Sequence, residues 1–155
     1  MRKRLLLIFG LATLLVLTLF MVCSIMNMLT KKRELRGKFE AIPVTANLFS
    51  LDSAGFVFSA SKPLVLVLFN STCEHCQYEL QQVEMFIDRF KDVELVFLSS
   101  EPIQAIKQSA LPFEGNRNVN FVKINPEDVF ANFGTVRYPT ILIYGTNGKL
   151  IKEFK

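Results

Sequence analysis

Two cysteines, Cys73 and Cys76, are separated only by Glu74 and His75 and follow an apolar run at residues 64–69. Thiols at this spacing can close into a small disulfide and reopen, and a helical pattern begins where the motif ends. Cys73 would then lie where unpaired backbone N–H groups and the helix dipole favour a thiolate. The spacing therefore predicts a redox-active pair.

The periodicity of the following helix assigns different roles to the two thiols. Cys76 shares a helix face with Leu80 and Val83, so it is expected to point inward, whereas Cys73 is expected to be exposed. An exposed thiolate attacks a substrate disulfide, and a shielded thiol then resolves the mixed disulfide. We therefore predict Cys73 as the nucleophile and Cys76 as the resolving cysteine.

A static disulfide or half of a zinc site are the alternatives for this pair. The chain has one histidine, and Cys23 is its only other cysteine, so a four-ligand zinc site cannot be assembled. Gln77 follows Cys76, where attachment of a c-type haem requires histidine. We expect neither a metal nor a cofactor.

The elements that must position the motif follow from the apolar patterns. Residues 64–69 are typical of a buried parallel strand, and helical spacing from Cys76 predicts a helix of about four turns to Lys91. Asn147-Gly148 between apolar runs indicates a hairpin. The remaining patterns predict short extended pieces at 47–52 and 55–58, strands at 94–98, 119–124, 141–144 and 149–154, helices at 101–109 and from Pro126 to Gly134, and a loop at 110–118. This order is that of an α/β domain with a mixed sheet flanked by helices.

A second feature precedes this domain. Residues 5–30 contain no charged side chain and would form a helix of about 39 Å, enough to cross a hydrocarbon core of about 30 Å. We predict a membrane anchor at 1–30, a basic linker at 31–45 and a domain at 46–155. A cleaved signal peptide and a lipoprotein modified at Cys23 are the alternatives.

The charge of the chain is unevenly distributed. Residues 1–40 hold eight Lys and Arg against two Glu, whereas the other residues hold ten against twelve acidic ones. The basic residues flank the apolar segment and suit anionic lipid headgroups, so we expect no nucleic-acid binding. Positive-charge counts slightly favour a cytoplasmic domain, but a short basic N-terminus and a tethered dithiol favour the outer face, which we predict.

At this point the sequence resembles the thioredoxin superfamily, and it is most similar to membrane-tethered proteins of the TlpA/ResA type. The resemblance covers roughly residues 46–155 and rests on the strand before Cys73-Glu74-His75-Cys76 and on Pro139-Thr140 before the terminal hairpin. It implies a thioredoxin-like fold in which Pro139 is cis and faces the disulfide. It also implies substrate contacts at Tyr138, through its backbone, and at Thr140.

The residues beside the cysteines would tune the pair. A cationic His75 would stabilise the Cys73 thiolate, and Glu74 would oppose it, so we expect an intermediate reduction potential. Ser71 and Glu74 fit a capping box at the start of the helix.

Two departures from the family pattern stand out. Thr72 and Val67 occupy the places where many thioredoxins have a Trp and a buried acid, so Cys76 would lose its proton to water, Glu74 or another carboxylate. The chain also reaches Lys155 without the usual C-terminal helix. The apolar sheet face would then be covered by segment 46–58, by the membrane or by a partner, and we favour a docking surface.

These features predict a membrane-anchored thiol–disulfide oxidoreductase that exchanges a Cys73–Cys76 disulfide with protein thiols. Its partners would be a protein substrate, a redox partner, and the membrane through residues 5–30. We expect a single-pass protein of the bacterial inner membrane with its domain on the periplasmic face. One alternative is a copper-binding or assembly module, although the copper-delivery relatives use C-x-x-x-C and a distant His. The other is a peroxidase, although Asn70 departs from the peroxiredoxin signature.

Overall fold

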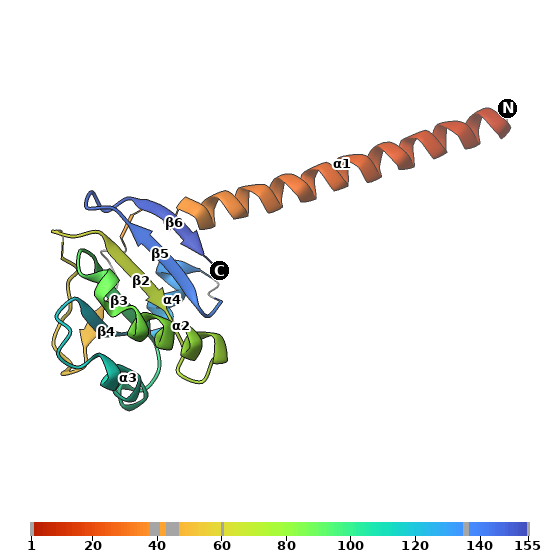
Figure 1. Ribbon diagram of the computed structural model, residues 1–155. Helices are drawn as coiled ribbons and strands as arrows, with labels where there is room; N and C mark the ends of the chain where they lie inside the picture. The colour runs from red at the N-terminus through yellow and green to blue at the C-terminus, as the bar shows by residue number, and fades with distance from the viewer. Residues whose placement is uncertain (1, 38–40, 43–46, 60, 135–136, 155) are drawn as a thin grey trace. The chain divides into compact units, whose positions relative to one another are not determined.

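The computed structural model describes residues 2–37, 41–42, 47–59, 61–134 and 137–154, and the chain divides into two compact units, Met1–Gly37 and Lys38–Lys155. The first unit is one uninterrupted helix, α1 (Arg2–Gly37; Figure 1). Its segment Thr13–Thr30 has a mean hydropathy of 2.0 and is long and apolar enough to cross a membrane. The helix continues beyond the predicted anchor into residues 31–37, because Lys, Arg, Glu and Leu are good helix formers.

The second unit is built on a six-stranded mixed sheet with the order β1-β4-β3-β2-β5-β6. Its three inner strands β2, β3 and β4 are parallel to one another, and β1, β5 and β6 pair antiparallel with their neighbours. The strands are β1 (Leu48–Ser50), β2 (Leu64–Leu68), β3 (Glu94–Ser99), β4 (Val119–Ile124), β5 (Thr140–Tyr144) and β6 (Leu150–Phe154). The predicted mixed sheet is confirmed.

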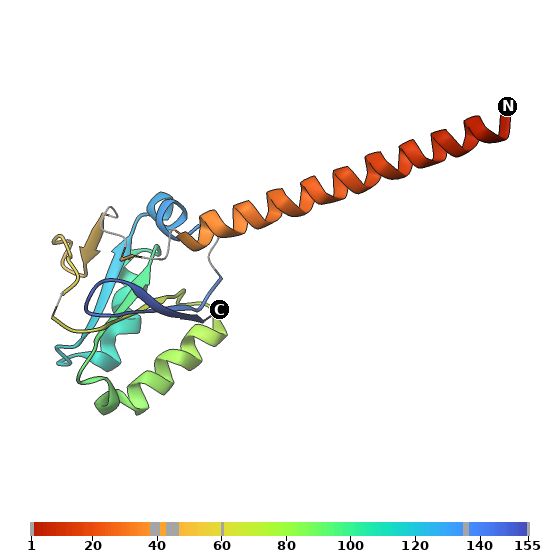
Figure 2. The same cartoon turned by 90° about the horizontal axis from the view of Figure 1, so that it is seen from above.

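Helices cover both faces of this sheet, as Figures 1 and 2 show for α2 on one side and α4 on the other. The helical elements are α2 (Glu74–Met85), the 3-10 turn η1 (Ile87–Phe90), α3 (Ile103–Ala110), the 3-10 turn η2 (Leu111–Phe113) and α4 (Pro126–Phe133). Side chains alternate across the strands, so Val67 and Phe97 pack toward α2 and α3 while Leu66 and Leu98 pack toward α4. Two apolar clusters therefore hold the three layers together.

The local differences from the sequence prediction are confined to helix ends and loops. The predicted helix to Lys91 is interrupted at Phe86, and the chain continues as η1, which still turns Ile87 and Phe90 toward the core. Residues 55–58 form no strand, and their only pairing among the described residues is an isolated bridge between Gly55 and Phe49. Within the predicted loop at 110–118, residues 111–113 form η2.

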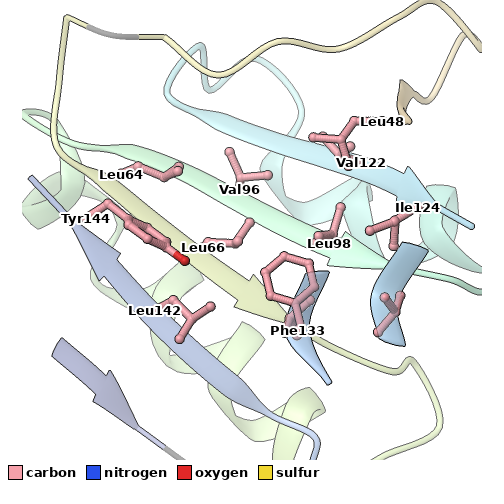
Figure 3. Close-up of a cluster of buried hydrophobic side chains, with 12 residues drawn as sticks. Leu48, Leu64, Leu66, Val96, Leu98, Val122, Ile124, Phe133, Leu142 and Tyr144 are labelled. Atoms are coloured by element: carbon pink, nitrogen blue, oxygen red, sulfur yellow. The ribbon is translucent and has the colours of Figure 1, made fainter. Parts of the chain in front are cut away.

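The sheet face opposite α2 is buried within the chain itself. Figure 3 shows Leu64, Leu66 and Tyr144 among the side chains of this cluster, and each is at most 1% exposed. The covering groups are Val129 and Phe133 of α4 and, from the segment between β1 and β2, Phe56 and Phe58, while Leu48 belongs to the sheet itself. Of the alternatives for this face, coverage by segment 46–58 is thus confirmed for its described part. The predicted docking surface is wrong here, because the face is already occupied.

Candidate active site

The two cysteines lie at the junction between β2 and α2, in different surroundings. Cys73 is the N-cap residue of α2 and is half-buried, whereas Cys76 lies in the first turn and is 1% exposed. Both thiols are free, and they interact with each other. The apolar strand β2 ends at Leu68, so the motif is held at the carboxyl edge of the central sheet.

Local hydrogen bonds separate the acidities of the two thiols. The backbone N–H and the thiol of Cys76, followed by the backbone N–H of His75, lower the pKa of Cys73. Loss of solvent opposes them, and the Glu74 carboxylate adds a smaller opposing contribution. Burial raises the pKa of Cys76 to about 12, and the nearby Cys73 and Glu101 act in the same direction. At neutral pH, Cys73 is therefore the thiol that more readily becomes a thiolate.

The start of α2 differs from the predicted capping box. No side chain caps this helix, since Cys73 occupies the N-cap position and the side chain of Ser71 is directed elsewhere. The backbone N–H and the hydroxyl of Ser71 both donate to the carboxylate of Glu101, at 2.7 Å each. Capping by Ser71 and Glu74 is wrong, because Cys73 and not Ser71 stands at the N-cap position and the Ser71 hydroxyl is turned toward the carboxylate of Glu101.

Glu101 is the site residue that sequence analysis missed. It follows β3, is half-buried, and accepts a further hydrogen bond of 3.1 Å from the hydroxyl of Ser99. Because β2 and β3 are parallel neighbours, the residues that follow them meet at one edge of the sheet. The order of the predicted strands could have placed Glu101 beside the cysteines.

The loop before β5 reaches the exposed cysteine. The Tyr138-Pro139 peptide bond is cis, and the thiol of Cys73 donates to the Tyr138 carbonyl across 3.6 Å. Thr140 is 2% exposed, and its hydroxyl donates to the carbonyl of Arg137 at 2.6 Å. The structure thus brings Tyr138 and Pro139 to the cysteines, and it places the Thr140 side chain beneath the loop.

The two residues between the cysteines point to the surface. The side chains of Glu74 and His75 are both exposed. Their side chains are thus available to a partner, whereas the backbone N–H of His75 acts on Cys73. Redox tuning by a charged His75 imidazole stays a prediction.

Four phenylalanine side chains pack beneath the motif in the same cluster as Cys76, and we call them the aromatic floor. Phe97 stacks on Phe121 with ring centroids 4.8 Å apart, and Phe69 and Phe113 pack against these rings. Val67, at the position where many thioredoxins have an acid, is buried in this same cluster with Cys76. The surroundings of Cys76 are therefore apolar on the sheet side.

An open groove lies between α2 and α3. It has a volume of about 320 Å³ and is lined by both polar and apolar side chains, among them Ser71, Gln77, Glu84 and Phe113. Ser71 lines this groove and lies two residues before Cys73, so the groove extends to the cysteine motif.

No protein-family model and no curated protein matches the sequence. Solved structures match the fold. A thioredoxin-like protein from Porphyromonas gingivalis has a TM-score of 0.60 at 18% identity, covering 74% of this chain and 79% of its own. A secreted disulfide oxidoreductase of Mycobacterium tuberculosis has a TM-score of 0.58 at 16% identity, covering 76% and 82%. StoA from Bacillus subtilis has a TM-score of 0.56 at 16% identity, covering 74% and 89%. The second unit therefore has a thioredoxin-like fold.

Proposed function

We propose that this protein is a membrane-anchored thiol–disulfide oxidoreductase that exchanges a Cys73–Cys76 disulfide with protein thiols. The observation that carries the proposal is the contrast between the two thiols. Cys73 is half-buried, has a lowered pKa and contacts the Tyr138 carbonyl, while Cys76 is buried directly behind it. An accessible nucleophile backed by a shielded thiol is what dithiol exchange needs.

In the proposed reaction the Cys73 thiolate attacks one sulfur of a substrate disulfide and displaces the other as a thiolate. Cys76 then attacks Cys73, which releases the second substrate thiol and leaves the Cys73–Cys76 disulfide. The protein dithiol is oxidised by two electrons and the substrate disulfide is reduced. The same steps in reverse would oxidise a substrate dithiol.

The loop at Pro139 supports a site for an extended substrate chain. The backbone of Tyr138 lies beside Cys73, so a peptide paired with it would bring its cysteine next to the nucleophile. For Thr140 we propose that the hydroxyl fixes this loop through Arg137, and direct contact between Thr140 and substrate stays a prediction.

Reduction of insulin by the full chain, with dithiothreitol as electron source, tests this function. Turnover is expected for the parent protein and none for Cys73→Ser. When reduced Cys76→Ser is freed of dithiothreitol and mixed with insulin, it is expected to accumulate a mixed disulfide through Cys73, visible as an added mass. Equal turnover in Cys73→Ser would overturn the proposal.

The reduction potential of the pair distinguishes a reductant from an oxidant. Stabilisation of the Cys73 thiolate favours the reduced form, whereas Glu74 opposes it, so we expect a value between about −270 mV, as in thioredoxin, and about −120 mV, as in a strong oxidant. Equilibration with glutathione buffers gives this value.

For the localisation, we propose a single-pass protein of the bacterial inner membrane with its domain on the periplasmic face. The apolar segment Thr13–Thr30 supports the anchor, and a tethered pair of cysteines at this spacing suits a compartment where disulfides form. Fusion of alkaline phosphatase or green fluorescent protein to the C-terminus tests the orientation, because the former is active outside the cytoplasm and the latter inside it.

A further inference from the structure

The chemistry at Cys76 requires a proton acceptor near the motif. This requirement rests on the proposed function, because Cys76 must become a thiolate before it can attack the mixed disulfide at Cys73. Burial is the largest cause that raises the pKa of Cys76, and it does not depend on whether Cys73 is free or bound to substrate, so Cys76 does not ionise readily in neutral solution. Val67 is buried on the sheet side of Cys76 and offers no acceptor there.

Glu101 occupies a place from which a carboxylate can serve this thiol. It follows β3 at the same edge of the sheet where β2 leads into the cysteine motif, and its charge acts on Cys76. The carboxylate of Glu74, by contrast, is exposed and acts on Cys73. Glu74 thus acts on the nucleophilic thiol, and Glu101 acts on the resolving thiol.

Hydrogen bonds hold Glu101 in this position. Its carboxylate accepts from the backbone N–H and the hydroxyl of Ser71 and from the hydroxyl of Ser99. The carbonyl of the same Ser71 accepts from the side-chain amide of Gln77 at 2.8 Å, and Gln77 follows Cys76 on α2. Ser71 therefore ties the carboxylate to the helix turn that carries the resolving thiol.

We propose that Glu101 accepts the proton that Cys76 loses when the mixed disulfide is resolved. The proton passes from the Cys76 thiol to the Glu101 carboxylate, and the Cys76 thiolate then attacks the Cys73 sulfur. The new Cys73–Cys76 bond forms as the bond between Cys73 and the substrate breaks, and the substrate leaves as a thiolate. In the reverse reaction the Glu101 carboxylic acid returns the proton to Cys76.

If Glu101 acted on Cys76 only through its charge, its removal would speed resolution of the mixed disulfide, whereas the loss of a proton acceptor would slow it. Among the described residues, the carboxylate of Glu101 raises the pKa of Cys76, and so does the Cys73 thiol as long as it is not bound to substrate. Without the charge of Glu101, more Cys76 would be ionised and resolution would be faster. A proton acceptor gives the reverse sign, since its loss slows resolution even though the thiol becomes more acidic.

Stopped-flow reaction of the reduced full chain with 5,5′-dithiobis(2-nitrobenzoate) separates the two steps. Attack by Cys73 releases the first nitrothiobenzoate, and attack by Cys76 on the mixed disulfide releases the second. All variants carry Cys23→Ser, so that the thiol in α1 does not contribute, and are studied in detergent. Glu84→Gln is the matched control, because Glu84 is an exposed acid that lines the groove beside Ser71.

For Glu101→Gln we expect an unchanged first phase and a second phase at least about tenfold slower at pH 7, in line with the loss of a general base. Glu84→Gln should leave both phases unchanged. Glu101→Asp, which keeps a carboxylate, should resolve faster than Glu101→Gln. The second phase of the parent should change little between pH 6 and 8, whereas that of Glu101→Gln should rise close to tenfold per pH unit.

An unchanged or faster second phase in Glu101→Gln would overturn the proposal, as would equal rates for Glu101→Asp and Glu101→Gln. The parent alone gives a further test that does not depend on how a variant folds, because a tenfold rise per pH unit in its second phase would exclude an internal acceptor. Absence of the first phase in the parent would instead refute the proposed function. The two failures are therefore distinguishable.

Discussion

At the scale of single residues, the site is defined by two thiols with opposite surroundings. Cys73 gains backbone hydrogen bonds that favour its thiolate, and Cys76 loses solvent and faces apolar side chains. The pKa values of the two cysteines shift in opposite directions although they lie only three residues apart, because Cys73 is at the start of the helix and Cys76 is on its inner face.

This contrast predicts different alkylation profiles for the two thiols. The lowered pKa of Cys73 means that its thiolate is present below the pH at which an ordinary cysteine ionises, so iodoacetamide should label it readily at pH 7. Cys76 in a Cys73→Ser variant should label slowly until the pH approaches strongly alkaline values. Mass spectrometry of timed samples between pH 5 and 10 measures both profiles, and coincident profiles would contradict the structure.

The charge of Glu74 gives a second prediction with a definite sign. Its carboxylate raises the pKa of Cys73, so Glu74→Gln should lower that pKa and speed the labelling of Cys73 near neutral pH. Glu84→Gln, further along the same helix, should leave the profile in place. Slower labelling in Glu74→Gln would show that the sign is wrong.

At the scale of elements, the sequence predicted the strands well because each is a short apolar run between turn residues. Strand β4 matches its predicted bounds, and β2, β3, β5 and β6 differ by one residue at an end. Helix ends were less predictable. The interruption at Phe86 falls inside a continuous helical pattern, in which Ile87 and Phe90 already belong to the buried face, so the pattern gives no sign of the 3-10 turn.

The candidate site was predictable only in part for a related reason. The cysteine motif is local, and resemblance supplied the loop at Pro139, which lies far from it in sequence. The bond between Ser71 and Glu101 joins residues that follow two different strands, so a local capping pattern was a misleading guide. The parallel pairing of β2 with β3 is what brings Ser71 and Glu101, which follow these strands, to the same edge of the sheet.

The aromatic floor predicts a large loss of stability when its centre is removed. Phe97 contacts Phe69, Phe113 and Phe121, and Phe97→Ala should lower the free energy of unfolding by about 3–5 kcal/mol. Phe130→Ala is the matched control, because Phe130 is 66% exposed on α4 and its loss should change stability by no more than about 0.5 kcal/mol. Chemical denaturation followed by circular dichroism compares them, and similar losses would contradict the packing.

At the scale of the whole molecule, α1 predicts retention in the membrane. Each arginine at the centre of a spanning helix costs about 2.5–3.5 kcal/mol, so Leu19→Arg combined with Val22→Arg should release the protein from the membrane fraction. The control Leu19→Ala with Val22→Ala should stay in that fraction after carbonate extraction. Release of the parent by carbonate would contradict an uncleaved anchor.

The pairing of β1 with β4 has a consequence for how the domain is completed during synthesis. β1 is the first strand to emerge, but Leu48 pairs with Ile124 and Ser50 with Val122, which are made much later. Contacts between distant parts of a chain form slowly, because closing the long intervening loop costs conformational entropy before the contacts are made. Strand β1 therefore cannot pair until β4 has been synthesised. Phe56 and Phe58 likewise cannot pack until the sheet face that they cover has formed. A nascent chain stalled before residue 119 would expose these side chains to chaperones and proteases.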